Sequence, residues 1–291
     1  MPTYNWYSFQ VAGVLACIQI ETHLPEEKSF LPFVCDHADG YRAIFRKVDV
    51  LPEFSAKAIC EKEYYRVHPD GKGGYIRSFF DEPRGLQPYA VAVYDFPNKR
   101  ITVDYLESGA RCVSEISNSF AHIAWEALLM HENRMMLHSA CVETPLGGLL
   151  FTGVSGAGKS TQAALWCEHG GGRLINGDRT ILHKEENGWV GYGSPYAGSS
   201  KCYVNEGIGV RAIVAVKKAD KNEVRRLSLK EAFRTVYSGL TVNTWDREFV
   251  SKACDFALEL VSEVPVYELA CTPDRGAVEA LQAVLGKEEC I

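Results

Sequence analysis

The sequence lacks the features that mark several large classes of protein. None of its apolar runs approaches the roughly 18 to 20 residues of a membrane span, so no membrane association is expected. Residues 1–5 show neither the basic stretch nor the cleavage pattern of a signal peptide, which favours a cytoplasmic protein. The formal net charge is −6, without the basic surplus of nucleic-acid binders, and no nucleic-acid partner is expected.

Paired cysteines, repeats and low-complexity segments are absent too. The ten cysteines fall singly, with no Cys-x-x-Cys pair. Most lie inside apolar runs, as Cys141 and Cys271 do, which is typical of small core residues in a reducing compartment. The sequence therefore predicts neither a zinc site nor a disulfide framework. With 291 residues and 46% apolar content, the chain can form one large globular domain or two ordinary ones.

One stretch, residues 153–161, carries a chemical motif. A glycine, four free positions and Gly-Lys-Ser follow the apolar run 149–151 and precede a helical pattern at 161–167. This is the context of a phosphate-binding loop, in which glycines turn backbone N–H groups inward and a helix N-terminus adds positive charge. The sequence thus predicts a nucleoside triphosphate site. Its expected lining is Gly153, Ser155, Gly156, Ala157, Gly158, Lys159, Ser160 and Thr161.

Three side chains have expected roles in handling the phosphates. Lys159 would lie between the β- and γ-phosphates, and Ser160 would hold Mg²⁺. Asp178 closes a short apolar strand after the loop helix, so it should reach the same carboxyl edge of the sheet. There it could bind Mg²⁺, directly or through water, or accept a hydroxyl proton. A plain turn aspartate is the alternative.

A histidine is expected beside the motif. Residues 137–142 read as a strand, and a turn at 145–148 joins it to the strand that enters the glycine-rich loop. This hairpin would place His138 next to the nucleotide strand. Two interpretations remain open, a donor to the γ-phosphate and a core histidine satisfied by backbone groups.

The first part of the chain, residues 1–112, consists of short β-like runs between turn residues. The clearest pair is 89–94 and 101–105, connected by a turn at 96–99. No chemical motif lies here. We interpret this part as a β-rich N-terminal module suited to recognition of a substrate or partner.

The remainder, residues 113–291, mixes strands and helices around the glycine-rich loop, which predicts an α/β domain. Apolar residues at spacings of three and four predict one helix over 116–130. The nearly all-apolar run 211–216 predicts a central strand buried on both faces. Ser228 opens a helix with a capping box, and Thr272 is the expected N-cap of the last helix.

Together, His138, the glycine-rich loop and Gly177-Asp178 resemble the HPr kinase/phosphorylase family in order and spacing. The resemblance covers residues 135–216. It implies the phosphoenolpyruvate carboxykinase-like class of phosphate-loop folds, with a mixed sheet flanked by helices. It also implies ATP, Mg²⁺ and phosphorylation of a serine hydroxyl, with Asp178 as base, His138 near the transferred phosphate, and a homo-oligomer.

One position departs from that family, because Asp178-Arg179 stands where the family has two consecutive aspartates. Arg179 could pair with the phosphates or remove a second metal. The chain looks closer to HPr-kinase-like proteins found beside peptide-modification genes, some of which phosphorylate a serine of a ribosomal peptide. The leading hypothesis is an ATP-dependent kinase for a peptide or protein serine, with Asp178, His138 and Lys159 as catalytic residues. The alternatives are a nucleotide-binding regulator or scaffold without phosphotransfer, a small-molecule kinase and a phosphorylase-type hydrolase.

Overall fold

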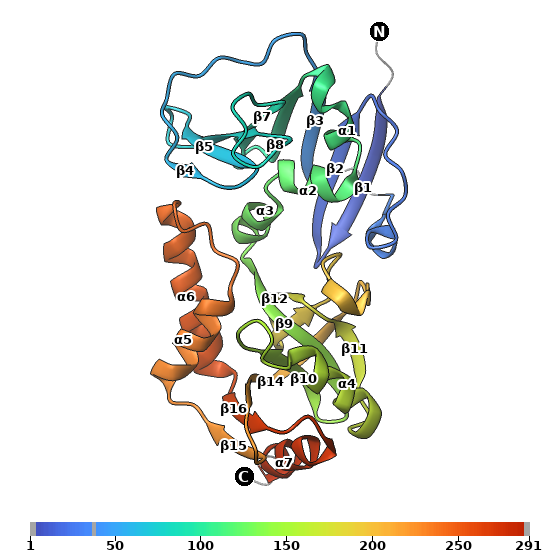
Figure 1. Ribbon diagram of the computed structural model, residues 1–291, viewed down its shortest axis with the longest axis vertical. Coiled ribbons are helices and arrows are strands. Elements are labelled where there is room, and N and C mark those ends of the chain that lie inside the picture. Colours follow the sequence, from blue (N-terminus) through green and yellow to red (C-terminus); the bar gives the residue numbers. More distant parts are fainter. Residues whose placement is uncertain (1–3, 37–38, 288–291) are drawn as a thin grey trace. The chain divides into compact units, whose positions relative to one another are not determined.

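The computed structural model describes residues 4–36 and 39–287. The chain divides into two compact units, residues 1–132 and 133–291. Each unit is built on a mixed sheet of strands accompanied by helices (Figure 1), so the α/β fold class is confirmed. Within the described ranges, no helix is long and apolar enough to cross a membrane.

An eight-stranded sheet forms the first unit. In pairing order its strands are β1 (Asn5–Val11), β2 (Val14–Ile20), β3 (Tyr41–Lys47), β8 (Arg100–Tyr105), β7 (Ala90–Asp95), β6 (Tyr75–Phe79), β5 (Tyr65–Pro69) and β4 (Cys60–Glu61). The pairs β2–β3 and β3–β8 are parallel, and the others are antiparallel. The predicted hairpin is confirmed as β7 and β8, and Lys99 in its turn adopts a left-handed φ of 52°.

Short helices pack against this sheet. They are η1 (Leu31–Phe33), η2 (Glu107–Gly109), α1 (Ala110–Val113), α2 (Ile116–His122) and α3 (Trp125–His131). The prediction of one continuous helix over 116–130 is wrong, because Ala124 adopts a left-handed φ of 55° between α2 and α3. The break brings Phe120 and Trp125 into contact, with ring centroids 5.0 Å apart. Apolar spacing is helical on both sides of Ala124, so it does not reveal the break.

The helices α2 and α3 belong to the first unit, whereas the sequence analysis grouped them with the second. His122 is fully buried; its Nε2 lies 2.9 Å from the Tyr89 hydroxyl, and its carbonyl accepts a hydrogen bond from Tyr94. Burial lowers the pKa of His122 to about 4, so the ring is neutral. Arg77 on β6 donates from Nη2 to Glu126 on α3 at 2.6 Å. These bonds attach α2 and α3 to β6 and β7.

A second mixed sheet organises residues 133–291. Its strands, in pairing order, are β10 (Gly147–Thr152), β9 (Arg134–Thr144), β12 (Arg179–Glu185), β13 (Gly188–Tyr192), β14 (Gly207–Lys218), β16 (Val266–Cys271) and β15 (Glu223–Arg226), with β11 (Arg173–Asn176) also on β9. Strand β10 pairs antiparallel with β9 and parallel with β14. The predicted central strand at 211–216 is confirmed within β14, which runs parallel to both β10 and β16.

Strand β9 pairs with different strands along its two halves. The first half of β9 pairs with β12 and ends at the pair His138–Arg179. Its second half pairs with β10 and begins at the pair Ser139–Thr152. The change of partner on β9 therefore lies beside the end of β10 and the start of β12. These are the strand ends that carry the predicted site.

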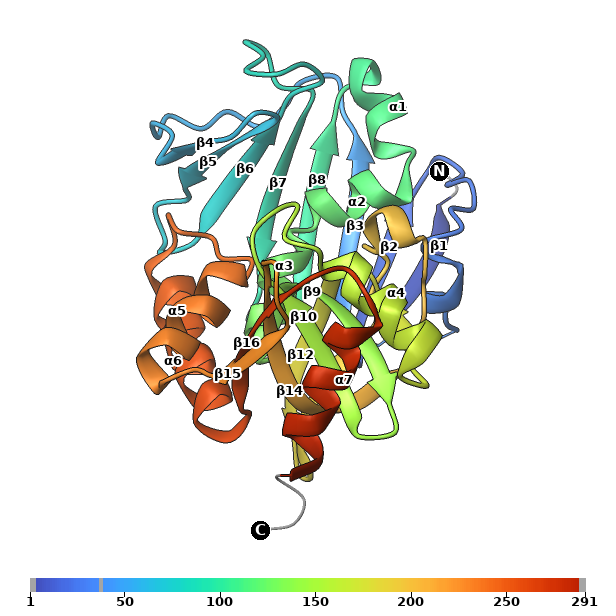
Figure 2. The same cartoon turned by 60° about the horizontal axis from the view of Figure 1, so that its bottom comes forward.

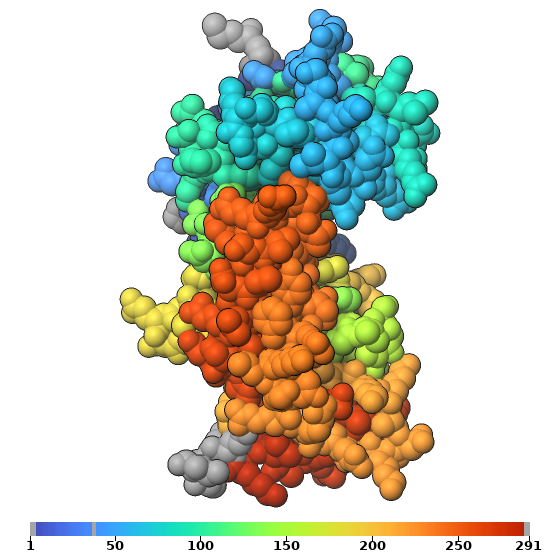
Figure 3. Space-filling view, turned by 90° about the vertical axis from the view of Figure 1, so that its left-hand side faces the viewer, coloured from blue at the N-terminus to red at the C-terminus, as the bar shows by residue number. Residues whose placement is uncertain are grey.

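Helices cover both faces of this sheet (Figure 2), with α4 (Lys159–His169) and α7 (Arg275–Leu285) on one face and α5 (Leu229–Gly239) and α6 (Arg247–Glu263) on the other. Under α4 and α7 lies a hydrophobic core cluster in which Trp166 and Phe151 are fully buried. On the α6 side, Phe256 meets Trp189 edge-on at 4.9 Å. Each such large apolar side chain contributes about 1.5–3 kcal/mol when fully buried. Figure 3 shows the outer surface of α5 and α6 in orange.

The N-terminal caps of α5 and α7 were both predicted from the sequence, with different outcomes. The capping box is confirmed: the Ser228 hydroxyl accepts the N–H of Glu231, and the Glu231 carboxylate accepts the N–H of Ser228. The expected N-cap of the last helix is wrong, because Asp274 caps α7 through the N–H of Gly276 at 2.8 Å. The Thr272 hydroxyl instead donates to Asp274 at 2.6 Å, and its N–H donates to Asn222.

Candidate active site

The glycine-rich loop, residues 153–158, connects the end of β10 to the start of α4. Gly153, Gly156 and Gly158 have φ of 139°, 75° and 110°, a region that side-chain-bearing residues rarely adopt. A Cβ on Gly153 would also lie 3.0 Å from the carbonyl oxygen of Val216 on β14. Conformation therefore favours glycine at all three positions, and at Gly153 the limited space favours it as well.

All eight residues expected to line a nucleotide site lie in this loop and in the first turn of α4. The loop holds Gly153, Ser155, Gly156, Ala157 and Gly158, and the turn holds Lys159, Ser160 and Thr161. Ser155, Gly156, Ser160 and Thr161 are exposed to solvent. The first N–H groups of α4 have no helical carbonyl partner, so this end of the helix favours an anion.

Lys159 folds over the mouth of the loop. Lys159 is only 8% exposed, and its Nζ donates to the carbonyl oxygens of Gly153 at 3.0 Å and Val154 at 3.3 Å. Burial lowers the pKa of Lys159; Asp178 counteracts this shift, and Arg179 adds to it. The ammonium group of Lys159 thus interacts electrostatically with Asp178 and Arg179 in the neighbouring turn.

That turn lies between β11 and β12, both of which pair with β9. Asn176 is fully buried, and its Oδ1 accepts the N–H of Asp178 at 2.9 Å and of Arg179 at 2.7 Å. Its Nδ2 donates to the carbonyl oxygen of Ser194 at 3.1 Å. The Asp178 carbonyl accepts the N–H of Ser139 at 3.0 Å. The turn is therefore held from both sides, which fixes the start of the Asp178 side chain.

His138 and Asp178 meet at the junction of β9, β10 and β12. His138 Nε2 lies 3.0 Å from Asp178 Oδ1, and each side chain is about one-third exposed, at 33% and 34%. Burial lowers the pKa of His138; Lys159 lowers it further, while Asp178 opposes both. A neutral imidazole at this distance donates its Nε2–H to the carboxylate. The three predicted catalytic residues, His138, Lys159 and Asp178, are thus brought to one place.

A loop of small residues packs against the Asp178 turn. A Cβ on Gly177 would collide with Ser200 Oγ, and a Cβ on Gly198 would lie 3.0 Å from Asp178 Cβ. Gly198 has a left-handed φ of 55° and opens η3 (Gly198–Ser200), whose residues are exposed. The end of the loop predicted at 193–201, residues 198–200, therefore forms a solvent-facing wall beside Asp178.

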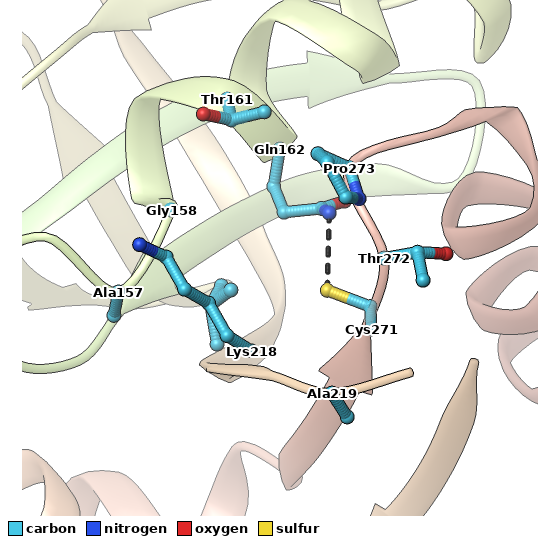
Figure 4. Close-up of a pocket in the computed structure, with 10 residues that line it drawn as sticks. Ala157, Gly158, Thr161, Gln162, Lys218, Ala219, Cys271, Thr272 and Pro273 are labelled. Carbon is cyan, nitrogen blue, oxygen red and sulfur yellow. Dashed lines mark hydrogen bonds between the residues drawn. The ribbon is translucent and has the colours of Figure 1, made fainter. Parts of the chain in front are cut away.

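A cavity of about 170 Å³ lies between the first turn of α4 and the ends of β14 and β16 (Figure 4). Its walls come from α4 and from the ends of β14 and β16: Ala157, Gly158, Thr161, Gln162, Val216, Lys218, Ala219, Cys271, Thr272 and Pro273. Gln162 Nε2 bonds Cys271 Sγ at 3.2 Å across the cavity floor. Lys218 extends toward Ala157 and Gly158 (Figure 4). The cavity is thus continuous with the glycine-rich loop.

The two expected Mg²⁺ ligands offer oxygen donors. Among the described residues, no three His, Cys, Asp or Glu side chains gather as a metal cage. Ser160 is exposed in the first turn of α4, and Asp178 keeps lone pairs beyond its bond to His138. Mg²⁺ is commonly held by one or two carboxylates, waters and substrate phosphates. The donors fit Mg²⁺ bound together with a nucleotide, and they do not form a stand-alone metal site.

Two important residues were missed by sequence reasoning. Asn176 positions Asp178, and the signal available for it was the Asn-Gly pair, which is typical of turns. Thr241, in the segment after α5, accepts a hydrogen bond from Arg179 Nη1 at 3.0 Å. No sequence motif surrounds Thr241, and only the tertiary fold places it here.

Comparisons with known proteins give little similarity. No protein-family model and no curated protein sequence matches the chain. Among solved structures, the Hpr(Ser) kinase/phosphatase from Coxiella burnetii is similar at 15% sequence identity, with a TM-score of 0.31. The match covers 53% of this chain and 90% of that one. A TM-score of this size is too low to carry the activity of that protein over to this chain.

Proposed function

We propose that this protein is an ATP-dependent phosphotransferase that moves the γ-phosphoryl group to a hydroxyl, most favourably a serine of a peptide or protein. One observation carries the proposal: the 3.0 Å contact between His138 and Asp178 lies beside a glycine-rich loop that holds Lys159. A phosphate cradle, a cation and a positioned carboxylate are the parts that phosphoryl transfer requires.

The loop and the start of α4 would bind the triphosphate. Backbone N–H groups of the loop face phosphate oxygens in such a turn, and the helix N-terminus favours their negative charge. Lys159 would exchange its two carbonyl partners for the β- and γ-phosphates. Ser160 and Asp178 would hold Mg²⁺, which when bound neutralises phosphate charge.

Asp178 would accept the proton of the acceptor hydroxyl. In the proposed step the hydroxyl oxygen forms a bond to the γ-phosphorus, the bond between that phosphorus and the β,γ-bridging oxygen breaks, and ADP leaves. The hydroxyl proton passes to the Asp178 carboxylate. His138 orients that carboxylate through its Nε2–H, and Asn176 fixes the backbone beneath it. General-base assistance of this kind contributes about 10² to 10⁴ in rate.

The acceptor would approach along the wall formed by Gly198, Ser199 and Ser200. These residues are exposed, Gly198 adds no side chain beside Asp178, and the Asp178 side chain is itself 34% exposed. Small residues allow a peptide backbone to approach closely. A serine of an extended segment therefore fits this side of the site better than a bulky ring substrate.

The direct test is phosphoryl transfer by the purified chain with ATP and Mg²⁺. Serine-containing peptides, free serine and water serve as parallel acceptors, and mass spectrometry identifies the product. Phosphoserine in a peptide supports the proposal. Phosphorylation of free serine alone favours a small-molecule kinase. Bound ATP with no transfer to any acceptor favours a nucleotide-binding regulator.

We further propose that the cavity beside α4 holds the nucleoside part of ATP. Replacing Ala219 by leucine in its wall should weaken ATP binding about tenfold, because overfilling a site costs about 1–3 kcal/mol. Binding of inorganic tripolyphosphate, which needs only the loop, should stay unchanged. Calorimetric titration of both ligands measures this. The control is Ala164→Leu on the exposed side of α4. Equal losses for the two ligands would rule out the nucleoside assignment.

His138→Gln separates two roles for the histidine. A residue that orients Asp178 or contacts the phosphate predicts a transfer rate reduced about tenfold or more, with little change in melting temperature, since the side chain is one-third exposed. A purely structural histidine predicts lower stability with normal turnover per folded molecule. His183→Gln, on β12 of the same sheet, is the matched control. A stable and fully active His138→Gln would remove His138 from the site.

A further inference from the structure

Arg179 is the second cation of the candidate site, and two elements hold it there. Its Nε lies 3.7 Å from Asp178 Oδ2, and its Nη1 donates to Thr241 Oγ1 at 3.0 Å. The side chain is 36% exposed, so the guanidinium is neither buried in the core nor free in solvent. Among the described residues its Nη2 has no hydrogen-bond partner.

Thr241 is itself fixed to the strand that carries His138. Its N–H donates to the carbonyl oxygen of Met136 on β9 at 2.8 Å, and the preceding residue, Leu240, bridges Leu137. Arg179 is also the direct partner of His138 in the β9–β12 register. The position of the guanidinium is therefore set by the strand pair on one side and by the end of α5 on the other.

The charges around Arg179 favour an anion. Lys159 and Arg179 supply two positive charges, whereas Asp178 supplies one negative charge and His138 is neutral. The cations already influence each other, since Arg179 lowers the pKa of Lys159. An arrangement with one uncompensated positive charge gains when a phosphate group enters, and a guanidinium can bind two phosphate oxygens at once.

We propose that Arg179 binds the terminal phosphate of the nucleotide triphosphate, and that Thr241 is the residue that positions it. This inference rests on the proposed phosphotransferase function. It assigns to the chain an internal arginine that stabilises the charge on the transferred phosphoryl group. It also assigns a role to the segment after α5, which holds the guanidinium through Thr241. ADP, which lacks that phosphate, should not need Arg179.

The test compares ATP with ADP on the full-length chain by calorimetric titration. Arg179→Ala should weaken ATP binding about 10- to 100-fold, the range expected for a hydrogen bond to a charged group, and ADP binding less than about twofold. Arg179→Lys should recover only part of the ATP affinity, because a lysine does not bind bidentately. Arg173→Ala on β11, an arginine paired with Glu143 and Glu206, is the control.

Thr241 has its own variants. Thr241→Val removes the acceptor for Arg179 Nη1 and should lower the ATP-over-ADP preference in the same direction as Arg179→Ala, by a smaller factor. Thr241→Ser keeps the hydroxyl and should retain the ATP-over-ADP preference of the wild type. If Thr241 has only a structural role, Thr241→Val should leave this preference unchanged. Equal losses of ATP and ADP in Arg179→Ala overturn the inference while leaving the phosphotransferase proposal intact. A wild-type chain that binds neither nucleotide overturns both.

Discussion

The Lys159→Ala variant is expected to lose ATP binding by about 100-fold or more while keeping its fold. Two contacts to charged phosphates, at about 1.5 kcal/mol or more each, correspond to that factor. The fold should survive because Lys159 Nζ bonds only two carbonyl oxygens of its own loop. Removing the ammonium also relieves its repulsion with Arg179, which contributes to the lowered pKa of Lys159. Calorimetric titration with ATP and Mg²⁺ gives the affinity, and circular dichroism the melting temperature.

The control for this variant is Lys252→Ala, which removes a surface lysine of α6 that pairs with Glu248. It should leave ATP affinity unchanged. A loss of about 1 kcal/mol of stability would move the melting temperature by about 2–4 °C in a unit of this size, so a larger drop in Lys159→Ala would indicate a damaged loop. Unchanged ATP affinity in folded Lys159→Ala would refute the nucleotide site.

Local patterns along the chain predict the parts of the site that depend on short segments. The strand–loop–helix context of residues 149–167 predicts β10 and α4, and the apolar run at 137–142 predicts the strand that carries His138. Each of these rests on periodicity or on glycine positions, which act within a few residues. Their meeting follows from the antiparallel pairing of β9 with β10, which a four-residue turn predicts.

Other features depend on contacts between distant segments, and the sequence does not reveal them. The link between Arg179 and Thr241 spans 62 residues, and no local pattern marks it. The partner change at His138 and Ser139 requires β9 to be longer than either neighbouring pairing, a property of the assembled sheet. The break at Ala124 and the cap at Asp274 are local features, but apolar spacing and the order of possible capping residues do not reveal them.

The Asp178→Asn variant is expected to show a large loss in the rate of phosphoryl transfer. Asp178→Asn keeps the size of the side chain and an oxygen that can accept the Nε2–H of His138. It cannot take up a proton. Transfer should therefore fall by about 10² to 10⁴, while ATP affinity stays within about threefold. Single-turnover transfer at saturating ATP measures the chemical step, and titration measures binding. Asp220→Asn, at an exposed position between β14 and β15, is the matched control.

Titration of Mg²⁺ then separates the two roles proposed for Asp178. If the carboxylate acts mainly as base, raising Mg²⁺ leaves the slow rate of Asp178→Asn unchanged. If it acts mainly as metal ligand, the variant needs more Mg²⁺, and excess Mg²⁺ restores much of the rate, because an amide oxygen binds the ion more weakly than a carboxylate. Full activity at low Mg²⁺ would exclude both roles. In that case the contact between His138 and Asp178 only stabilises the turn, and the acceptor proton leaves by another route.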